Sequence, residues 1–231
     1  MTNSKIAIII TAAGSSTRIG GNIKKEYLPF QKGTVLSTSV QTFLSACKNN
    51  FTITDFIITC PAGGFSECKK SLSSIGSDLD LISIVEGSST RQKSVYNALC
   101  AIKNTPTPDL VLIHDGARPF VSKKIILDSI SAAQEFGASV PGLTPTDTQK
   151  QIDEEGFIIK HLQRSSLVAV QTPQAFHYDK LLQAHQKAHL ETIEYTDDTE
   201  IWGKYCGKVR IIPGDVQNIK ITYPKDLETL K

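Results

Sequence analysis

Three small residues and three cations follow the first apolar run of the chain, residues 6–10. They are Ala12, Ala13 and Gly14, and then Arg18, Lys24 and Lys25. Small residues let the backbone approach a ligand closely, and nearby cations supply charge, a combination that suits a triphosphate. An ordinary strand-to-helix turn with solvated Lys and Arg side chains is the alternative, and this segment alone leaves both open.

A second polar group, HDGARPF, follows a later apolar run. Asp115 and Arg118 lie three residues apart and are stiffened by Pro119. Such a pair can orient a hydroxyl and hold a phosphate through two hydrogen bonds, although it can also merely close a turn. We expect His114 to be buried and hydrogen-bonded rather than to act as a base.

Other familiar sites are missing from the sequence. There is no GxxxxGK[ST] and no GxGxxG motif, so neither a P-loop nor a dinucleotide-binding turn is indicated. The five cysteines are scattered without metal-ligand spacing and are expected to be structural thiols. A formal DxD match at Asp78 to Asp80 precedes a strand, whereas a metal-dependent glycosyltransferase needs it after one, so we interpret it as loop.

Composition excludes several classes of protein. With 231 residues, 40% hydrophobic and 21% charged, the chain is typical of a globular protein with a sizeable core. A net charge of +2, without a dense run of Lys and Arg, argues against a nucleic-acid partner. The apolar run near the start is short for a signal peptide or a membrane span, so we expect a cytoplasmic protein with no membrane partner.

Alternating strand and helix patterns predict the elements that position these loops. Apolar β-branched runs predict strands buried on both faces near residues 6–10, 53–59, 81–85 and 110–113. Apolar stripes at helical spacing occur at residues 35–44, 95–102 and 122–136. The alternation predicts an α/β fold with a mainly parallel sheet and right-handed crossovers.

The alternation breaks after Ala138. Residues 143–166 read as two short strands around a turn at Gly156, and they are too polar to bury a core, so we expect an arm that packs on a partner subunit. After the arm we expect a helix near 178–190, a helical turn from Thr196, strands near 209–212 and 219–222, and a helix after Pro224. Without a linker or internal repeat, residues 1–231 are expected to form a single domain.

Seven motifs occur in the order and spacing of one enzyme family. They are AAG with the following Arg and KEYL, then GSSTRQKSV, HDGARPF, TDT, QTPQAF, TDDTE and NIKIT. Together they cover nearly the whole chain and resemble the 2-C-methyl-D-erythritol 4-phosphate cytidylyltransferases. The resemblance implies a Rossmann-like nucleotide-diphospho-sugar-transferase fold, CTP and Mg²⁺ as requirements, and a role in non-mevalonate isoprenoid synthesis. It also implies a homodimer whose arms complete each other's active sites.

The resemblance implies roles for individual residues as well. It places the cytidine and phosphates against Ala12, Ala13 and Gly14, and the cytosine against Gly87, Ser88 and Ser94. The cations around the triphosphate would be Arg18, Lys25 and Lys220. The acceptor would meet Asp115, Arg118 and Thr196, with Lys220 as a further candidate. Thr148, Arg164 and Thr172 would reach across from the partner's arm.

The chain departs from the family pattern at one lysine, and two other functions stay open. The family usually has Pro before the phosphate-binding lysine, whereas here Lys24 precedes Lys25; we choose Lys25 by its distance to Tyr27. A ribitol 5-phosphate cytidylyltransferase is the close alternative, because both acceptors are polyol phosphates and the CTP half is shared. A non-catalytic nucleotide-binding module is the distant one, although it would not need two converging anion sites.

Overall fold

An eight-stranded sheet forms the centre of the computed structural model, which describes residues 4–14, 24–102, 106–191 and 193–230. The strand order is β10-β7-β11-β6-β1-β4-β5, and β12 pairs with β7. The strands are β1 Lys5–Thr11, β4 Thr52–Cys60, β5 Ile82–Glu86, β6 Leu110–Asp115, β7 Ala138–Leu143, β10 Ala169–Val170, β11 Gln174–His177 and β12 Arg210–Pro213. β5, β4, β1 and β6 are mutually parallel, as predicted, whereas β11 runs antiparallel between β6 and β7.

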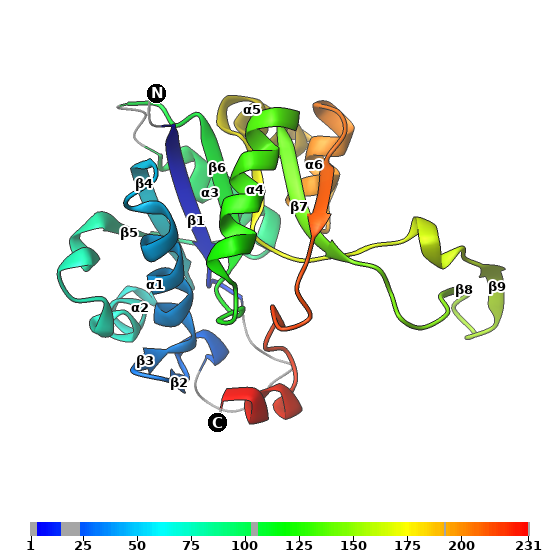
Figure 1. The fold of residues 1–231 in the computed structure, drawn as a ribbon, viewed down its shortest axis with the longest axis horizontal. Helices are drawn as coiled ribbons and strands as arrows, with labels where there is room; N and C mark the ends of the chain where they lie inside the picture. The colour runs from blue at the N-terminus through cyan, green and yellow to red at the C-terminus, as the bar shows by residue number, and fades with distance from the viewer. Residues whose placement is uncertain (1–3, 15–23, 103–105, 192, 231) are drawn as a thin grey trace.

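Helices cover both faces of this sheet (Figure 1). They are α1 Val35–Cys47, α2 Phe65–Ser71, α3 Arg91–Cys100, α4 Lys123–Phe136, α5 Tyr178–Leu190 and α6 Asp198–Tyr205. Because side chains alternate along a strand, β1 serves two cores: Ile8 packs with α1, α2 and α4, and Ile9 packs with α3, α5 and α6. No helix in the described segments is long and apolar enough to cross a bilayer.

Local sequence fixes where the helices begin and end. The Thr34 side chain accepts from the Ser37 backbone, and Ser37 returns the bond, so a capping box starts α1. At the start of α4 the Ser122 side chain accepts from the Ile125 amide, and Gly137 ends the helix with φ at 87°, a conformation that glycine adopts without steric cost. The chain can therefore turn directly from α4 into β7.

The structure corrects the sequence interpretation in the outer parts of the sheet. β5 is an edge strand with a single neighbour and is half exposed, so it is not buried on both faces. Residues 219–222 form no strand; the Ile221 amide donates to the Ala117 carbonyl at 2.9 Å instead. The last helix is a 3₁₀ helix, Pro224–Leu230. Three strands from Ala138 onward, β7, β10 and β11, had no counterpart in the prediction, nor had α2.

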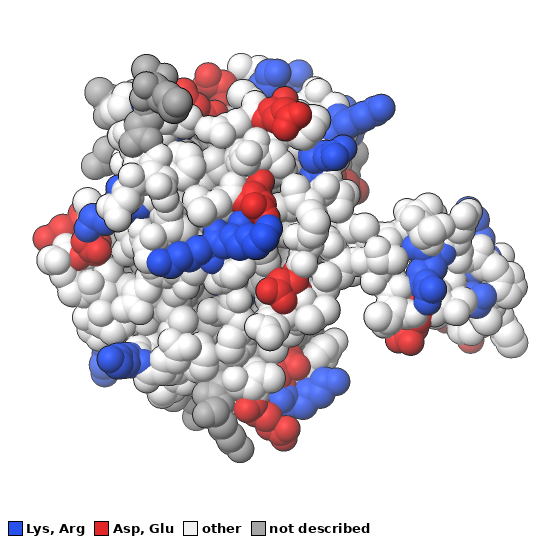
Figure 2. Space-filling view, in the orientation of Figure 1, with Lys and Arg blue, Asp and Glu red and all other residues white. Residues whose placement is uncertain are grey.

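The segment between β7 and β10 forms the predicted arm (Figure 1). Its two strands, β8 Lys150–Ile152 and β9 Ile158–His161, pair only with each other and are exposed along their length. Figure 2 shows the arm standing away from the body of the molecule and carrying basic side chains. It is less polar than expected, since Ile152, Phe157, Ile158 and Ile159 are each between 55% and 66% exposed.

Candidate active site

A cavity of about 550 Å³ opens at the edge of the sheet where the parallel strands end. Thr11 and Asp115, the last residues of β1 and β6, are paired in register, which brings the loops that follow them together. The cavity is lined by Thr11, Ala13, Gly14, Lys25, Glu26, Ser88, Ser89, Thr90, Arg91, Ser94, Asp115, Ala117, Lys220 and Thr222. Ligands in open α/β sheets bind at this edge.

One side of the cavity is built from small residues and hydroxyls. The Ser94 hydroxyl accepts from the Ser88 amide at 2.9 Å and donates to the Thr90 carbonyl at 2.8 Å, which fixes the loop that enters α3. Gly87 lies behind this lining, where an added Cβ would meet the Cβ of Ala13 at 2.3 Å. Ala12 is likewise buried below the cavity, and its amide bonds to Thr59. These two predicted residues therefore shape the cavity floor from beneath.

The two adjacent lysines point to different partners. Lys25 begins a short 3₁₀ helix, Lys25–Tyr27, and lines the cavity although it is largely buried. Lys24 donates to the Gly14 carbonyl, and its Nζ lies 3.7 Å from Glu26 Oε2. The geometry thus supports Lys25 as the lysine that faces a ligand, with Lys24 bracing the loop. The predicted Arg18 lies outside the described residues.

Cations surround Asp115, which also lines the cavity. Lys220 Nζ is 2.8 Å from its carboxylate, Arg91 Nε is 3.4 Å away and Arg118 Nε is 3.6 Å away. Burial alone would raise the pKa of Asp115, but Lys220, Arg91 and Arg118 outweigh it and hold the pKa well below its usual range. The carboxylate stays ionised and leaves this side of the cavity with net positive charge.

Hydrogen bonds from buried neighbours hold Asp115 from behind. The Thr172 hydroxyl, in a residue only 4% exposed, accepts from the Asp115 amide at 3.1 Å and contacts His114 Nδ1 at 2.9 Å. His114 Nε2 lies 3.2 Å from the Arg118 carbonyl, which can only accept, so this nitrogen carries the proton. Burial lowers the pKa of His114 to about 4, so the ring is neutral at pH 7, as expected for a residue that is not a base.

One expectation about Thr172 is wrong. It was assigned to the partner's arm, but it lies beside Asp115 of its own chain. The reason is the direction of β11, which pairs antiparallel with β6 and therefore starts at the edge where β6 ends. Sequence distance from Asp115 gave no hint of this, because the antiparallel strand was not predicted.

The remaining acceptor residues are not among those that line the cavity. Arg118 donates from Nη1 to the Asn218 carbonyl at 2.6 Å and sits behind Asp115 rather than in the lining. Thr196 is exposed, and both its amide and its hydroxyl donate to Glu200 Oε2. Thr148 and Arg164 belong to the arm, where Arg164 Nη1 donates to the Thr146 carbonyl at 2.5 Å. A single chain therefore does not bring the two arm residues to the cavity.

Sequence reasoning missed two charged residues of the lining, Arg91 and Glu26. Arg91 is the first residue of α3 and contacts both Asp115 and the buried Asp198. A signal was available, because a charged residue at the start of a helix that follows a parallel strand lies at the ligand-binding edge. Glu26 gave no comparable signal between a lysine and a tyrosine.

Known proteins resemble this chain over nearly its whole length. The family model described as 2-C-methyl-D-erythritol 4-phosphate cytidylyltransferase matches residues 6–230. Enzymes of that name from Clostridium botulinum and Clostridium perfringens are each 40% identical to it, and the matches cover 96% of this chain and 96% of each relative. A solved 4-diphosphocytidyl-2C-methyl-D-erythritol synthase from Anaerococcus prevotii superimposes with a TM-score of 0.83 at 28% identity, covering 98% of this chain and 94% of that one. The chain therefore belongs to the 2-C-methyl-D-erythritol 4-phosphate cytidylyltransferase family.

Proposed function

We propose that the protein transfers CMP from CTP to 2-C-methyl-D-erythritol 4-phosphate, releasing pyrophosphate and forming 4-diphosphocytidyl-2-C-methyl-D-erythritol, a step of non-mevalonate isoprenoid synthesis. Family membership names the reaction. The observation that carries the proposal is one cavity whose lining combines two groups of residues. Ala13 and Gly14 line it together with Lys25, and so do Asp115 and the cations Arg91 and Lys220 beside it.

The arrangement suits in-line displacement at phosphorus. An oxygen of the acceptor's phosphate attacks the α-phosphorus of CTP, the new P–O bond forms as the bond to the β-phosphate oxygen breaks, and pyrophosphate leaves on the opposite side. Two anions must approach each other, so positioning and charge neutralisation are the protein's main tasks. Lys25 and Lys220 lie in the lining where they can perform them, and we assign Arg18 to the same task. The attacking phosphate is already ionised, so no protein nucleophile is required.

The cavity also suits a magnesium ion carried by the phosphates of the nucleotide. No group of three or more His, Cys, Asp or Glu side chains in the described segments could form a protein cage for a metal. Asp115 lines the cavity, but its two oxygens already face Lys220, Arg91 and Arg118. Mg²⁺ commonly relies on substrate phosphates for much of its coordination, so the phosphates of CTP would mainly hold it here. When bound, it would neutralise charge on the triphosphate.

We also propose a homodimer in which each arm reaches the other subunit's cavity. The four exposed apolar side chains on the hairpin support this, since an isolated projection has no use for them. Thr148 and Arg164 would then contact the acceptor from the partner, opposite Asp115 and Arg118 of the first chain. The assembly would have two-fold symmetry and two equal sites.

Mixing two inactive variants tests the exchange of arms. Arg164→Ala and Arg118→Ala chains should each be nearly inactive, whereas their heterodimer has one intact site, giving about a quarter of wild-type activity after random pairing. Mixing Arg118→Ala with Lys220→Ala is the matched control, because both changes lie in the body and no site is restored. Heterodimers confirmed by mass but without recovery would show that Arg164 acts within its own chain or not at all.

Acceptor identity is tested by measuring pyrophosphate release from CTP with each candidate acceptor. We expect turnover with 2-C-methyl-D-erythritol 4-phosphate and little with ribitol 5-phosphate. A preference for ribitol 5-phosphate would overturn the proposal, and release with neither would favour a nucleotide-binding module.

The reaction is assigned to the cytoplasm, since all five cysteines are free thiols, as is usual in a reducing compartment.

A further inference from the structure

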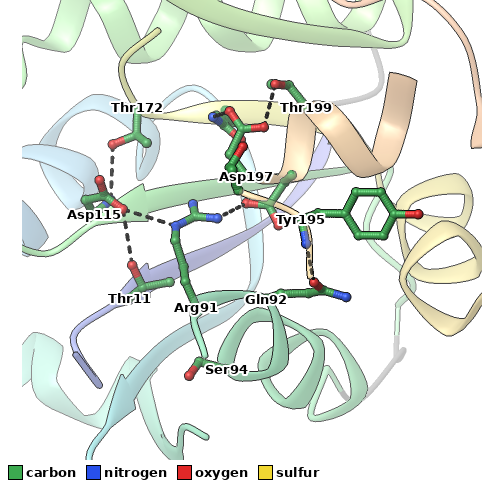
Figure 3. Close-up of polar contacts among 12 residues, drawn as sticks. Thr11, Arg91, Gln92, Ser94, Asp115, Thr172, Tyr195, Asp197 and Thr199 are labelled. Atoms are coloured by element: carbon green, nitrogen blue, oxygen red, sulfur yellow. Dashed lines mark hydrogen bonds and ion pairs between the residues drawn. The ribbon is translucent and has the colours of Figure 1, made fainter. Parts of the chain in front are cut away.

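Arg91 joins two parts of the active site that are far apart in the sequence (Figure 3). Its Nε lies 3.4 Å from Asp115 Oδ1, at the end of β6. Its Nη1 donates to Asp198 Oδ2, in the first turn of α6, at 2.7 Å. One guanidinium group thus bridges the carboxylate on the acceptor side and a helix that starts 107 residues further along the chain than Arg91 itself.

The second end of this bridge is anchored firmly. Asp198 is 0% exposed, and His185 Nε2 lies 3.0 Å from its other oxygen. Burial would raise the pKa of Asp198, but Arg91 and His185 hold it below its usual value. The carboxylate is therefore an ionised, immobile partner for the guanidinium.

The segment before α6 is tied to α3 by a second contact. Gln92, the next residue of α3, accepts a hydrogen bond from the Tyr195 amide at 2.9 Å through its side-chain oxygen (Figure 3). Tyr195 and Asp198, the residues that Gln92 and Arg91 bind, flank Thr196 in the sequence. Thr196 is the exposed residue expected on the acceptor side. The position of Thr196 relative to Asp115 thus depends on the first turn of α3.

We propose that Arg91 is a positioning residue that fixes Asp115 and the Tyr195–Asp198 segment relative to each other, and so sets the geometry in which the acceptor phosphate is held. The inference rests on the proposed function, because it concerns the acceptor of that reaction. Arg91 itself need not touch the reacting atoms. Its Ser94 neighbour on α3 belongs to the nucleotide side of the same cavity, so the bridge also ties the acceptor side to the helix that frames the nucleotide.

A purely stabilising role does not account for this arrangement. Arg91 Nη2 is buried and has no hydrogen-bond partner among the described residues, and an unsatisfied buried donor costs stability. Buried ion pairs in general add little net stability compared with apolar packing. The arrangement is therefore explained better by orientation of two carboxylates than by stability.

The first test is Arg91→Gln, with Lys93→Gln as the matched control. Lys93 lies in the same helical turn, but its side chain is exposed. We expect Arg91→Gln to lower kcat/KM for the acceptor by about tenfold to a hundredfold, the scale of a misplacement near 1 Å, while the Kd for CTP stays within about threefold. Lys93→Gln should leave both values near wild type. Equal losses in acceptor kcat/KM and in CTP affinity would contradict a role confined to the acceptor side.

The second test separates positioning from neutralisation of Asp198. The pair Arg91→Gln with Asp198→Asn removes both charges of the ion pair and should recover thermal stability lost in Arg91→Gln. Catalysis should stay low, because Asp115 still lacks the guanidinium of Arg91. If the pair recovers kcat/KM as well as stability, Arg91 serves only to neutralise Asp198 and the inference is overturned.

Crystal structures of wild type and Arg91→Gln give a readout that does not depend on the reaction. We expect the Asp115 carboxylate or the Tyr195–Asp198 segment to move by about 1 Å or more. Unchanged positions would overturn the inference even if the enzyme used another acceptor. Inactive wild-type protein with the expected displacement would instead count against the proposed function alone.

Discussion

Asp115→Asn tests how far the acceptor side depends on one carboxylate. Asp115 faces Lys220 at 2.8 Å, Arg91 at 3.4 Å and Arg118 at 3.6 Å. With an effective dielectric constant near 20, each such pair attracts by about 4–6 kcal/mol, but removing the carboxylate from water offsets most of that gain. The net effect is therefore set by which cation is left buried without a counter-charge.

Arg118 is that cation. Lys220 is 36% exposed and can turn to water, and Arg91 keeps Asp198. The Arg118 side chain is only 12% exposed, and Asp115 is the carboxylate it pairs with. Breaking a buried pair costs about 3–5 kcal/mol, and Asn keeps the volume of Asp, so we expect a loss of about 3 kcal/mol in the free energy of unfolding. For a chain of this length that lowers Tm by about 6–12 °C.

Thermal unfolding at pH 7, together with pyrophosphate release, checks this prediction. We expect the rate with the acceptor to fall by about a hundredfold, as for loss of a preorganised charged group. The control is Asp128→Asn, which removes a carboxylate from an exposed pair with Lys124 and should change the unfolding free energy by less than about 1 kcal/mol. If Asp115→Asn melts within about 2 °C of wild type, Asp115 does not hold these cations together and the electrostatic account of the site fails.

Three further changes test other parts of the site. Lys25→Ala should reduce kcat at saturating CTP by about a hundredfold and Lys24→Ala by less, because only Lys25 lines the cavity; the reverse order in steady-state assays would contradict the assignment. Gly87→Ala should raise the KM for CTP, since its Cβ would lie 2.3 Å from that of Ala13; an unchanged KM would show that the floor is not rigid. Burial lowers the pKa of His114 to about 4, so between about pH 4 and 6.5 the folded state binds fewer protons than the unfolded state. The free energy of unfolding therefore falls by about 3 kcal/mol in total as the pH drops through this range. His114→Gln should flatten this part of the pH profile in chemical denaturation, and an identical slope would refute the burial argument.

The parallel half of the fold was predictable because its strands are continuous apolar runs separated by amphipathic helices. The strands predicted at residues 6–10 and 110–113 lie within β1 and β6. The helix predicted at residues 122–136 coincides with α4 and its N-cap. Periodicity alone was informative there, since each run has to be buried on both faces.

The other half was not predictable from local pattern. β11 has four residues, and its direction is set by pairing with β6 and β7 rather than by its own sequence. The run at 219–222 looks like a strand, yet it joins no sheet, and its Ile221 amide bonds to the Ala117 carbonyl instead.

The residues of the site were likewise predictable only in part. Motifs in register located Asp115 and Lys220, which the fold brings to 2.8 Å from each other. Arg91 and Asp198 were missed as a pair, because a contact across 107 residues leaves no local pattern. The roles assigned to Thr148, Arg164 and Thr196 stay predictions, since none of the three lines the cavity of the single chain.

The way the arm joins the sheet makes it an exchangeable module. The chain leaves the sheet at Leu143 and returns at Ala169, and these two residues are direct neighbours across the β7–β10 pair. Residues 144–168 can therefore lengthen, shorten or diverge in sequence without shifting the register of any strand in the central sheet. In the homodimer proposed above, partner choice between subunits would then evolve separately from folding stability. Two copies of such an enzyme in one cell would be kept from forming mixed dimers by exchanging this single segment.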